Sequence, residues 1–258
     1  MKNGEVNSMQ FERVKSGVPG FDDLVGGGLP RGYCYTVAGG PGSGKTTFAL
    51  QFIHKGITEH GENGVYVSLD ESPNSIRASA LSFGMNLEDL EKAGKLVMID
   101  ASPIRLEVGR YAVRTPAMLG IPNFNIDSVV GTLHEVVEKI GAKRVAVDSL
   151  TSLLMQYSDP FVVRKETLSL IRSISEVEGC TALLLSETVE GEITQFKTEM
   201  FLVNGVILLH SIRQDEEKTR AIEVLKIRGV DHSTRMHPFK ITDKGIVIYP
   251  EERVFSPT

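Results

Sequence analysis

The amino-acid sequence predicts an α/β fold in which helices cover both faces of a mostly parallel β-sheet. Short apolar runs typical of buried strands alternate with longer segments of helical period along most of the chain. From residue 204 onwards, strand-like runs follow one another with only short turns between them. Strands that alternate with helices form parallel sheets, whereas strands joined by turns pair antiparallel. We therefore expect antiparallel strands at the C-terminal end of the sheet.

The predicted elements follow in chain order. Strands are expected over residues 32–38, 64–69, 96–100, 144–147 and 181–185, and helices over residues 45–60, 73–83, 126–140 and 161–178. Ser72 before Pro73 is typical of a helix start, because serine caps free N–H groups and proline lacks one. The last strands are expected over residues 204–209, 220–227 and 246–249. Residues 101–125 fit neither period and are expected to form a mobile loop or a short helix at the surface.

Length and composition set further limits. No repeat, low-complexity tract or flexible linker divides the 258 residues. We therefore expect one domain over residues 1–258, with a core over about 11–250 and a loose N-terminal arm over 1–10. The formal net charge of −5 excludes a globally basic nucleic-acid coat and leaves only a local basic groove open.

The sequence carries no signal for a membrane or for export. No apolar run approaches the ~18 residues of a membrane helix, and the first residues lack the apolar segment of a signal peptide. Cys34 and Cys180 both lie in apolar runs and cannot form a disulfide framework, so we expect buried thiols. These features predict a cytoplasmic protein that makes no membrane contact.

The clearest motif is a complete GxxxxGK[ST] pattern between a predicted strand and a predicted helix. It consists of Gly39, Gly40, Pro41, Gly42, Ser43, Gly44, Lys45 and Thr46, and Thr47 follows it. Glycines let backbone N–H groups surround a phosphate, and the helix N-terminus adds a partial positive charge. The lysine would reach the β- and γ-phosphates, and the Thr46 hydroxyl would bind Mg²⁺. The motif predicts a P-loop that binds ATP or ADP together with Mg²⁺.

A P-loop requires a second acid at the end of another buried strand, and Asp148 follows the apolar residues 145–147. A carboxylate at the C-terminal end of a parallel strand faces the nucleotide crevice and can hold Mg²⁺ through water. We therefore predict that Asp148 and Thr46 form the metal site. An aspartate that only ends a strand in a turn is the alternative interpretation.

Two adjacent carboxylates, Asp70 and Glu71, end the predicted strand over residues 64–69. We expect this strand to lie beside the P-loop strand, where a carboxylate can orient and polarise the water that attacks ATP. Acidic residues before a helix also favour its N-terminus. The residues alone therefore leave both interpretations open.

Together, these residues resemble the KaiC family of RecA-like P-loop ATPases over about residues 16–250. The resemblance covers the N-terminal segment 16–30, the P-loop, the acidic pair, residues 100–103 and residues 147–151. The N-terminal segment and the P-loop are shared with RadA-type recombinases. The Lys-x-Arg-Gly-x-x-His pattern over residues 226–232, and the hairpin over 238–246 that follows it, are specifically KaiC-like.

The resemblance implies a role for each of these segments. Glu71 would be the catalytic glutamate, and Asp70 stands where the family usually has a second glutamate. Lys226 and Arg228 would reach the γ-phosphate of the neighbouring subunit in a ring, expected to be a hexamer, with His232 assisting. From the pattern alone, these two cations share one face of a strand, opposite Ile227, and such a face is also often merely solvated.

The resemblance does not carry over a self-phosphorylating activity. The clock protein of the family phosphorylates an adjacent Ser-Thr pair just before the strand that corresponds to residues 204–209. Here the matching residues are about Met200 and Phe201, which carry no hydroxyl. We therefore expect no autokinase activity.

The expected function is slow, Mg²⁺-dependent ATP hydrolysis at the interfaces of a ring, in a regulatory or signalling role with a protein partner that the sequence does not name. One alternative is a RadA-like DNA-repair ATPase, and another is a nucleotide-gated interaction module with negligible turnover. DNA binding requires basic channel loops. Residues 150–161 contain Asp159 and no cation, and residues 188–200 carry Glu190, Glu192 and Glu199 against Lys197. Nucleic acid is therefore disfavoured, and the one mildly basic segment carries Arg105, Arg110 and Arg114 against Glu107.

Overall fold

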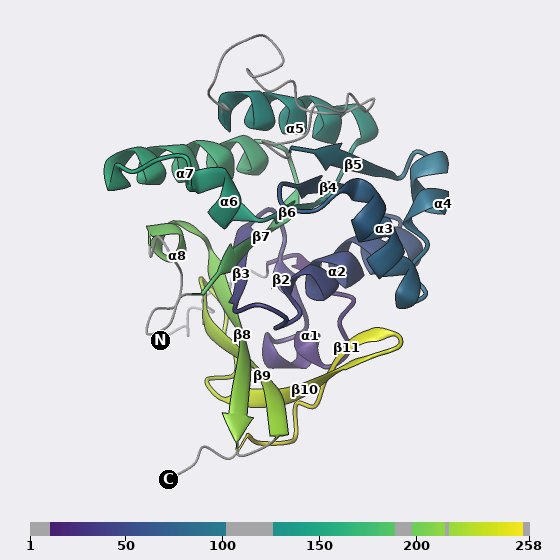
Figure 1. Ribbon diagram of the computed structural model, residues 1–258, viewed down its shortest axis with the longest axis vertical. Helices are drawn as coiled ribbons and strands as arrows, with labels where there is room; N and C mark the ends of the chain where they lie inside the picture. Colours follow the sequence, from purple (N-terminus) through teal and green to yellow (C-terminus); the bar gives the residue numbers. More distant parts are fainter. Residues whose placement is uncertain (1–10, 102–125, 189–197, 215–216, 255–258) are drawn as a thin grey trace, which may run out of the picture.

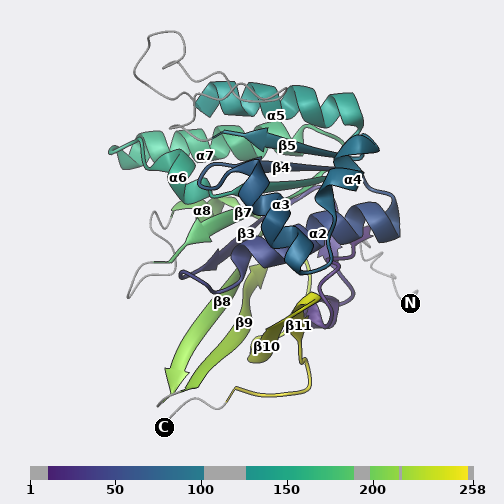
Figure 2. The same cartoon turned by 45° about the vertical axis from the view of Figure 1, so that its right-hand side comes forward.

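The computed structural model describes residues 11–101, 126–188, 198–214 and 217–254. In these ranges, a nine-stranded mixed sheet forms the centre of the molecule, and helices pack on both of its faces (Figures 1 and 2). The strand order is β11-β10-β9-β8-β3-β7-β6-β4-β5. The α/β class predicted from the sequence is confirmed.

The strands of the sheet are β3 (Cys34–Gly39), β4 (Gly64–Ser68), β5 (Leu96–Asp100), β6 (Arg144–Asp148), β7 (Thr181–Glu187), β8 (Gly205–Gln214), β9 (Glu217–Ile227), β10 (Met236–Thr242) and β11 (Gly245–Ile248). A separate small sheet pairs β1 (Arg13–Val14) with β2 (Leu29–Pro30). The helices are α1 (Phe21–Leu24), α2 (Lys45–His60), α3 (Pro73–Ser82), α4 (Leu87–Lys92), α5 (Ile126–Ile140), α6 (Leu150–Leu154), α7 (Pro160–Ser175) and α8 (Thr198–Leu202). Every predicted strand and helix is present, with ends that shift by a few residues at most.

The position of β4 differs from the prediction. We expected β4 beside the P-loop strand β3, but β7 and β6 lie between them. The connecting helix α2 has 16 residues and is therefore about 24 Å long. Three strand spacings require only about 14 Å, so the chain can pass over two strand positions that β6 and β7 fill later. The acidic pair after β4 consequently lies beside the end of β6.

The antiparallel part of the sheet begins one strand later than expected. β8 runs parallel to β3, and only β9, β10 and β11 join by antiparallel pairing. A register shift interrupts the β8–β9 pairing between Val206 and Ile207, opposite Leu225. β10 was not among the predicted strands, although the resemblance implied a hairpin at this place.

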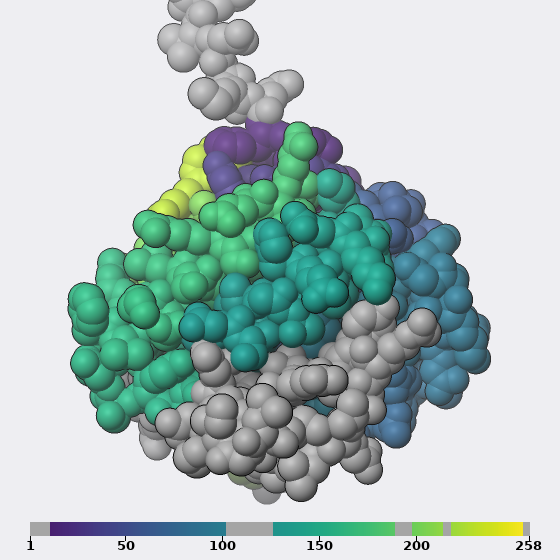
Figure 3. Space-filling model, turned by 90° about the horizontal axis from the view of Figure 1, so that it is seen from above, coloured from purple at the N-terminus to yellow at the C-terminus, as the bar shows by residue number. Residues whose placement is uncertain are grey.

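Side chains at alternating positions along each strand belong to two hydrophobic cores, one on each face of the sheet. Tyr35 and Val37 pack with α1, α2, α3 and the β10–β11 hairpin, whereas Cys34 and Ala38 pack with α5, α6 and α7. This alternation is the period-two geometry of a strand that is covered on both faces. α5 and α7 contact each other and form much of the surface in Figure 3. Both cysteines are free and buried, and burial raises the pKa of each thiol to about 12.

Besides β10, the elements that were not predicted are short. They are β1, β2, α1, α4, α6 and α8, of two to six residues each. The predicted cap of α3 is present, because the Ser72 side chain accepts a hydrogen bond from the Ser75 N–H. The predicted arm, residues 1–10, and all but the first residue of 101–125 lie outside the described residues. Among the described helices, none combines the length and apolarity that crossing a bilayer requires.

Candidate functional site

The P-loop links the end of β3 to the start of α2. Gly42 and Gly44 adopt positive φ angles of 68° and 105°, a region that glycine enters without steric cost. Gly44 is also the N-cap of α2, and no side chain caps the first N–H groups of the helix. These N–H groups can therefore bind an anion such as a phosphate. A Cβ at Gly39 would overlap the Ser43 hydroxyl, so only glycine fits there.

Lys45 folds back over the loop. Its Nζ donates hydrogen bonds to the carbonyl oxygens of Gly39 at 2.7 Å and Gly40 at 3.2 Å. Burial lowers the pKa of Lys45, and the negative charges of Glu187, Asp148 and Asp70 partly offset this effect. The ammonium group thus lies among carboxylates at the mouth of the loop, where a phosphate group would be bound.

Asp148 and Thr46, the predicted metal residues, lie within hydrogen-bonding distance of each other. Thr46 Oγ1 donates to Asp148 Oδ2 at 2.8 Å, and the Tyr66 hydroxyl donates to the same oxygen at 2.6 Å. Burial raises the pKa of Asp148, although these two hydrogen bonds act in the opposite direction. Tyr66 was not among the predicted site residues. The signal was its position inside a buried strand, since a buried tyrosine hydroxyl needs a partner.

The two carboxylates after β4 are exposed and have different partners. Ser149 Oγ donates to Asp70 Oδ2 at 2.9 Å, on the side of β6. Ser75 Oγ donates to Glu71 Oε2 at 2.7 Å, in the first turn of α3. The charge of Asp70 raises the pKa of Lys45, so this carboxylate lies in the electrostatic range of the P-loop. Asp70 therefore flanks the site, and Glu71 follows it just before the start of α3.

Glu187, at the end of β7, is a further acid that the sequence analysis did not select. The parallel register places it opposite Gly39, the first P-loop residue. Its N–H donates to Thr151 Oγ1 at 2.9 Å, and the next N–H, that of Thr188, contacts the Gly39 carbonyl at 3.4 Å. An acid at the C-terminal end of a parallel strand was the signal used for Asp148. The same signal identifies Glu187 once β7 is known to neighbour β3.

Lys226 and Arg228 lie toward the opposite end of the strands from the P-loop. Gly205 pairs with Tyr35 of β3 on one side and with the β9 residue between the two cations on the other. Tyr35 precedes Gly39 by four residues, which is about 13 Å along a strand. The pair is therefore not brought to the P-loop of its own chain.

The carbonyl groups around α8 hold both cations. Lys226 Nζ donates to the Val203 carbonyl at 3.0 Å, and Arg228 Nη2 donates to the Phe201 carbonyl at 2.7 Å. β9 ends at Ile227, so Arg228 lies beyond the strand in which we expected it. Ile227 is nevertheless buried between the two more exposed cations, as the alternation predicted. His232 follows in the loop after β9, and its ring Nδ1 is 3.4 Å from the Val230 carbonyl oxygen.

The donor set beside the P-loop fits Mg²⁺. Among the described residues, no group of three or more His, Cys, Asp or Glu side chains could form a protein cage for a metal. Mg²⁺ does not need one, because it usually binds one or two carboxylates, several waters and substrate phosphates. A threonine hydroxyl and one carboxylate at a phosphate-binding loop meet that requirement.

Comparisons with known proteins place the chain in a family. The model of the KaiC ATPase family matches residues 14–253. The chain belongs to the KaiC family. It is 35% identical over 94% of its length to the circadian clock oscillator protein KaiC of Parasynechococcus marenigrum, and 38% identical over 93% to the circadian clock protein KaiC3 of a Synechocystis species. It spans about half of these curated relatives, 46% of each.

A solved structure agrees over the whole fold. The KaiC-like protein from the hyperthermophilic archaeon Pyrococcus horikoshii is 36% identical, and the match covers 93% of this chain and 100% of that one with a TM-score of 0.80. The predicted RecA-like fold and the resemblance to the KaiC family are therefore confirmed. The chain carries a nucleotide-binding ATPase domain of this family.

In this KaiC-family chain, two cations of β9 lie near the P-loop of the same subunit. Arg220 Nε is 3.5 Å from the Gly42 carbonyl oxygen, and the Lys218 ammonium is near the same glycine. Neither residue was among the predicted site residues. The sequence gives only their separation from Lys226 along β9. That separation indicates that they lie near the P-loop only once the antiparallel register of β9 with β8 is known.

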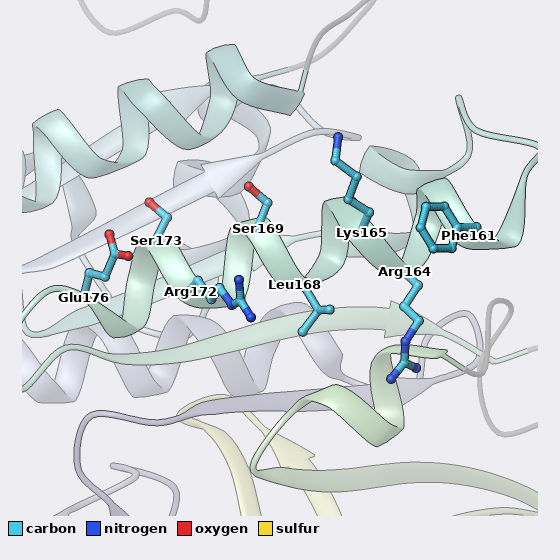
Figure 4. Close-up of a pocket in the computed structure, with 8 residues that line it drawn as sticks. All are labelled: Phe161, Arg164, Lys165, Leu168, Ser169, Arg172, Ser173 and Glu176. Atoms are coloured by element: carbon cyan, nitrogen blue, oxygen red, sulfur yellow. The ribbon is translucent and has the colours of Figure 1, made fainter.

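A hollow of about 580 Å³ lies elsewhere, on the exposed face of α7. Its described lining consists of Phe161, Arg164, Lys165, Leu168, Ser169, Arg172, Ser173 and Glu176. Figure 4 shows Lys165, Ser169 and Ser173 pointing away from Arg164 and Leu168. No P-loop residue and none of the predicted acids lines it, so this hollow is not part of the nucleotide site.

One acid that we counted in a channel loop is not in a loop. Glu199 is fully buried in α8, and its side chain accepts a hydrogen bond from Ser186. The other charged residues of that loop, Glu190, Glu192 and Lys197, lie outside the described residues. Arg105, Glu107, Arg110 and Arg114 also lie outside them.

Proposed function

We propose that this chain binds Mg²⁺–ATP in its P-loop and hydrolyses it slowly at the interfaces of a homo-oligomeric ring. One observation carries the proposal: the P-loop and the Lys226–Arg228 pair lie toward opposite ends of the strands of one sheet. Such a molecule offers a nucleotide site on one side and two cations on the other. Copies that associate head to tail bring the two together, and a rotation that closes gives a ring. The family resemblance favours a hexamer.

Binding uses the loop and its lysine. The uncapped N–H groups of α2 bind the phosphates, and Lys45 Nζ exchanges the Gly39 and Gly40 carbonyls for phosphate oxygens. Mg²⁺, when bound, supplies positive charge against the β- and γ-phosphates. Thr46 and Asp148 would hold it, and the Tyr66 hydroxyl fixes the orientation of the Asp148 carboxylate.

Hydrolysis uses the acids after β4. Glu71 accepts a proton from a water molecule while the water oxygen attacks the γ-phosphorus. The bond from that phosphorus to the bridging oxygen breaks, and ADP and phosphate leave. Ser75 Oγ occupies one oxygen of Glu71 and so restricts the orientation of the carboxylate. Asp70, held by Ser149, is the alternative base.

The cations complete the site from the next subunit. Lys226 and Arg228 stabilise the charge that develops on the transferred phosphoryl group, and an arginine in this role is worth ~10³–10⁵ in rate. Exposed apolar side chains flank the pair: Phe201 is 68% exposed and Leu225 is 39% exposed. Large apolar side chains beside charges are typical of a surface that another protein covers. These apolar side chains support association of subunits at this end of the sheet.

Mixed assembly tests the proposal. Arg228→Ala and Glu71→Gln proteins should each be nearly inactive, and co-assembled rings should recover part of the ATPase rate. Recovery occurs because some interfaces then join an intact nucleotide site to the arginine of a neighbour that still binds nucleotide. Mixed rings with no recovery, or a fully active monomer, would overturn the proposal.

Two other functions remain as outcomes of a second experiment. A nucleotide-gated interaction module would bind ATP, turn it over negligibly and capture a protein only in one nucleotide state. A RadA-like role would appear as DNA binding that weakens steeply with salt. Pull-downs with ATP, with ADP and without nucleotide, combined with a turnover assay, separate these functions from a dedicated ATPase.

A further inference from the structure

We propose that Glu199 is a positioning residue that couples the nucleotide site of each subunit to the Lys226–Arg228 pair that the same subunit offers to its neighbour. The inference rests on the proposed function, because it requires the pair to act across an interface. It gives the ring a means by which one site governs the next.

A chain of hydrogen bonds joins β7 to α8. The Glu187 N–H donates to Thr151 Oγ1 at 2.9 Å, Thr151 Oγ1 and Ser186 Oγ are 3.3 Å apart, and Ser186 Oγ donates to Glu199 Oε1 at 2.9 Å. A hydroxyl has only one proton to donate. Since Ser186 gives its proton to Glu199, Thr151 must donate to Ser186. The chain therefore runs in one direction and ends at the carboxylate.

The first end of this chain of hydrogen bonds, at Glu187, lies beside the P-loop and can respond to its occupant. The Gly39 carbonyl contacts two donors, Lys45 Nζ at 2.7 Å and the Thr188 N–H at 3.4 Å. When ATP draws the lysine to its phosphates, this carbonyl loses its nearer donor and can take the Thr188 N–H more closely. The end of β7 then has different contacts in the loaded and empty states, which a coupling mechanism requires.

The second end, at Glu199, lies in the helix whose carbonyl groups hold Lys226 and Arg228. Glu199 lies in the first turn of α8, and its carbonyl accepts from the Val203 N–H at 3.1 Å. The carbonyl of Val203 holds Lys226, and that of Phe201 holds Arg228. A shift of α8 therefore moves both cations together.

The buried carboxylate of Glu199 also lowers the stability of the fold, which is unexpected for a residue with a purely structural role. Glu199 is fully buried, as are Thr151 and Ser186, and Glu199 Oε2 has no hydrogen-bond partner among the described residues. An unsatisfied buried oxygen costs about 1–3 kcal/mol, more when charged. An apolar side chain would fill the same space without this cost, so stability alone does not account for the glutamate.

Dilution of active rings with Lys45→Ala subunits tests the coupling. These subunits bind no nucleotide but still offer an intact arginine. If an empty subunit holds its arginine out of place, a site works only when both it and its neighbour are loaded, and an equal mixture should retain about one quarter of the wild-type rate. Without coupling, the same mixture should retain about one half.

Variants along the chain then assign the coupling to Glu199. Thr151→Val, Ser186→Ala and Glu199→Met each interrupt the chain, and equal mixtures built on any of them should retain about one half of the rate of their own undiluted rings. Glu199→Gln keeps an acceptor oxygen and should retain about one quarter. Thr167→Val is the matched control, because Thr167 is a buried helical threonine whose hydroxyl, within the described ranges, donates to the Val163 carbonyl of its own helix and takes no part in the chain. Its mixtures should behave as wild type.

The outcomes separate this inference from the proposed function. Wild-type protein without ATPase activity, or without dependence on Arg228, contradicts the proposed function. An active, Arg228-dependent ring whose equal mixture retains one half, or retains one quarter even with Thr151→Val, overturns the inference alone. A merely structural defect lowers the rate of the undiluted ring but leaves the fraction retained on dilution unchanged. If Thr151→Val does not fold, Ser186→Ala provides the same reading.

Discussion

The Tyr66 hydroxyl donates a 2.6 Å hydrogen bond to Asp148 Oδ2, the same oxygen that accepts from Thr46 Oγ1. Tyr66 lies on β4 and Asp148 ends β6, and the two strands pair in parallel. The tyrosine thus orients the acid that would hold Mg²⁺, from a neighbouring strand and from inside the core. This contact makes the protonation of Asp148 accessible to experiment.

We predict that Tyr66→Phe makes Mg²⁺–ATP binding more sensitive to acid. Burial raises the pKa of Asp148, and the hydrogen bonds from Tyr66 and Thr46 restrain that rise. Loss of one hydrogen bond raises the pKa further, so a proton displaces Mg²⁺ at a higher pH. Nucleotide affinity, measured from pH 5 to pH 8 with and without Mg²⁺, should fall on the acid side, and the midpoint should be higher in the variant. Asp148→Asn, which cannot titrate, is the control, and equal midpoints for wild type and Tyr66→Phe would contradict the prediction.

We predict that Glu71→Gln lowers ATP turnover by roughly 10²-fold or more while nucleotide binding persists. The amide keeps the shape of the side chain and can still accept from Ser75, but it cannot take the proton of the attacking water. Single-turnover hydrolysis and nucleotide affinity, measured on the same protein, check the two parts. Asp70→Asn is the matched variant. If it is the more damaging change, the two acids have the opposite roles.

The protein should not phosphorylate itself stably. The residues that match the phosphorylated pair of the clock protein are Met200 and Phe201, and α8 places them directly before β8. Neither side chain has an oxygen nucleophile. Purified protein incubated with labelled ATP should therefore carry no label after denaturation. Stoichiometric label that persists through denaturing electrophoresis would show that another residue accepts the phosphoryl group.

The parts of the site that the sequence predicted depend on local pattern. The P-loop needs only eight consecutive residues, and Asp148 needs only a strand end, so both could be placed without knowing which strands are neighbours. Glu187 could not, because its value depends on the pairing of β7 with β3. The place of β4 was wrong for the same reason.

Short elements explain the remaining differences. α8 has five residues, which is too few for a hydrophobic period, and Glu199 was therefore taken for a loop acid although it is buried. The coupling chain through Thr151 and Ser186 joins residues that are 13 to 48 positions apart in sequence order. No pattern along the chain reveals such contacts, and only the packing of α6 and α8 against β7 brings them together.

The last prediction concerns stability and a buried guanidinium. Arg144, at the start of β6, is fully buried, and its Nε donates to Glu62 Oε2 at 2.6 Å. Its guanidinium lies over the Phe52 ring, 4.6 Å from the centroid, in space that exists only because residue 56 of α2 is glycine. Removing one partner leaves an uncompensated buried charge, which costs about 3–5 kcal/mol. Glu62→Gln should therefore lower the melting temperature by roughly 6–20 °C in a chain of this size.

The pH dependence and a matched control complete this test. Burial alone would raise the pKa of Glu62, but the hydrogen bonds and charges of Arg31 and Arg144 outweigh it and lower that pKa. The ionised group then contributes stability that is present above the ordinary pKa of 4.5 and is lost as the pH falls through the lowered value. Below that range, wild type and Glu62→Gln should melt at similar temperatures. Glu59→Gln removes an exposed ion pair with Lys55 on the same helix, and it should cost less than about 0.5 kcal/mol at any pH. Equal melting temperatures for the two variants at pH 7 would show that Arg144 does not need Glu62.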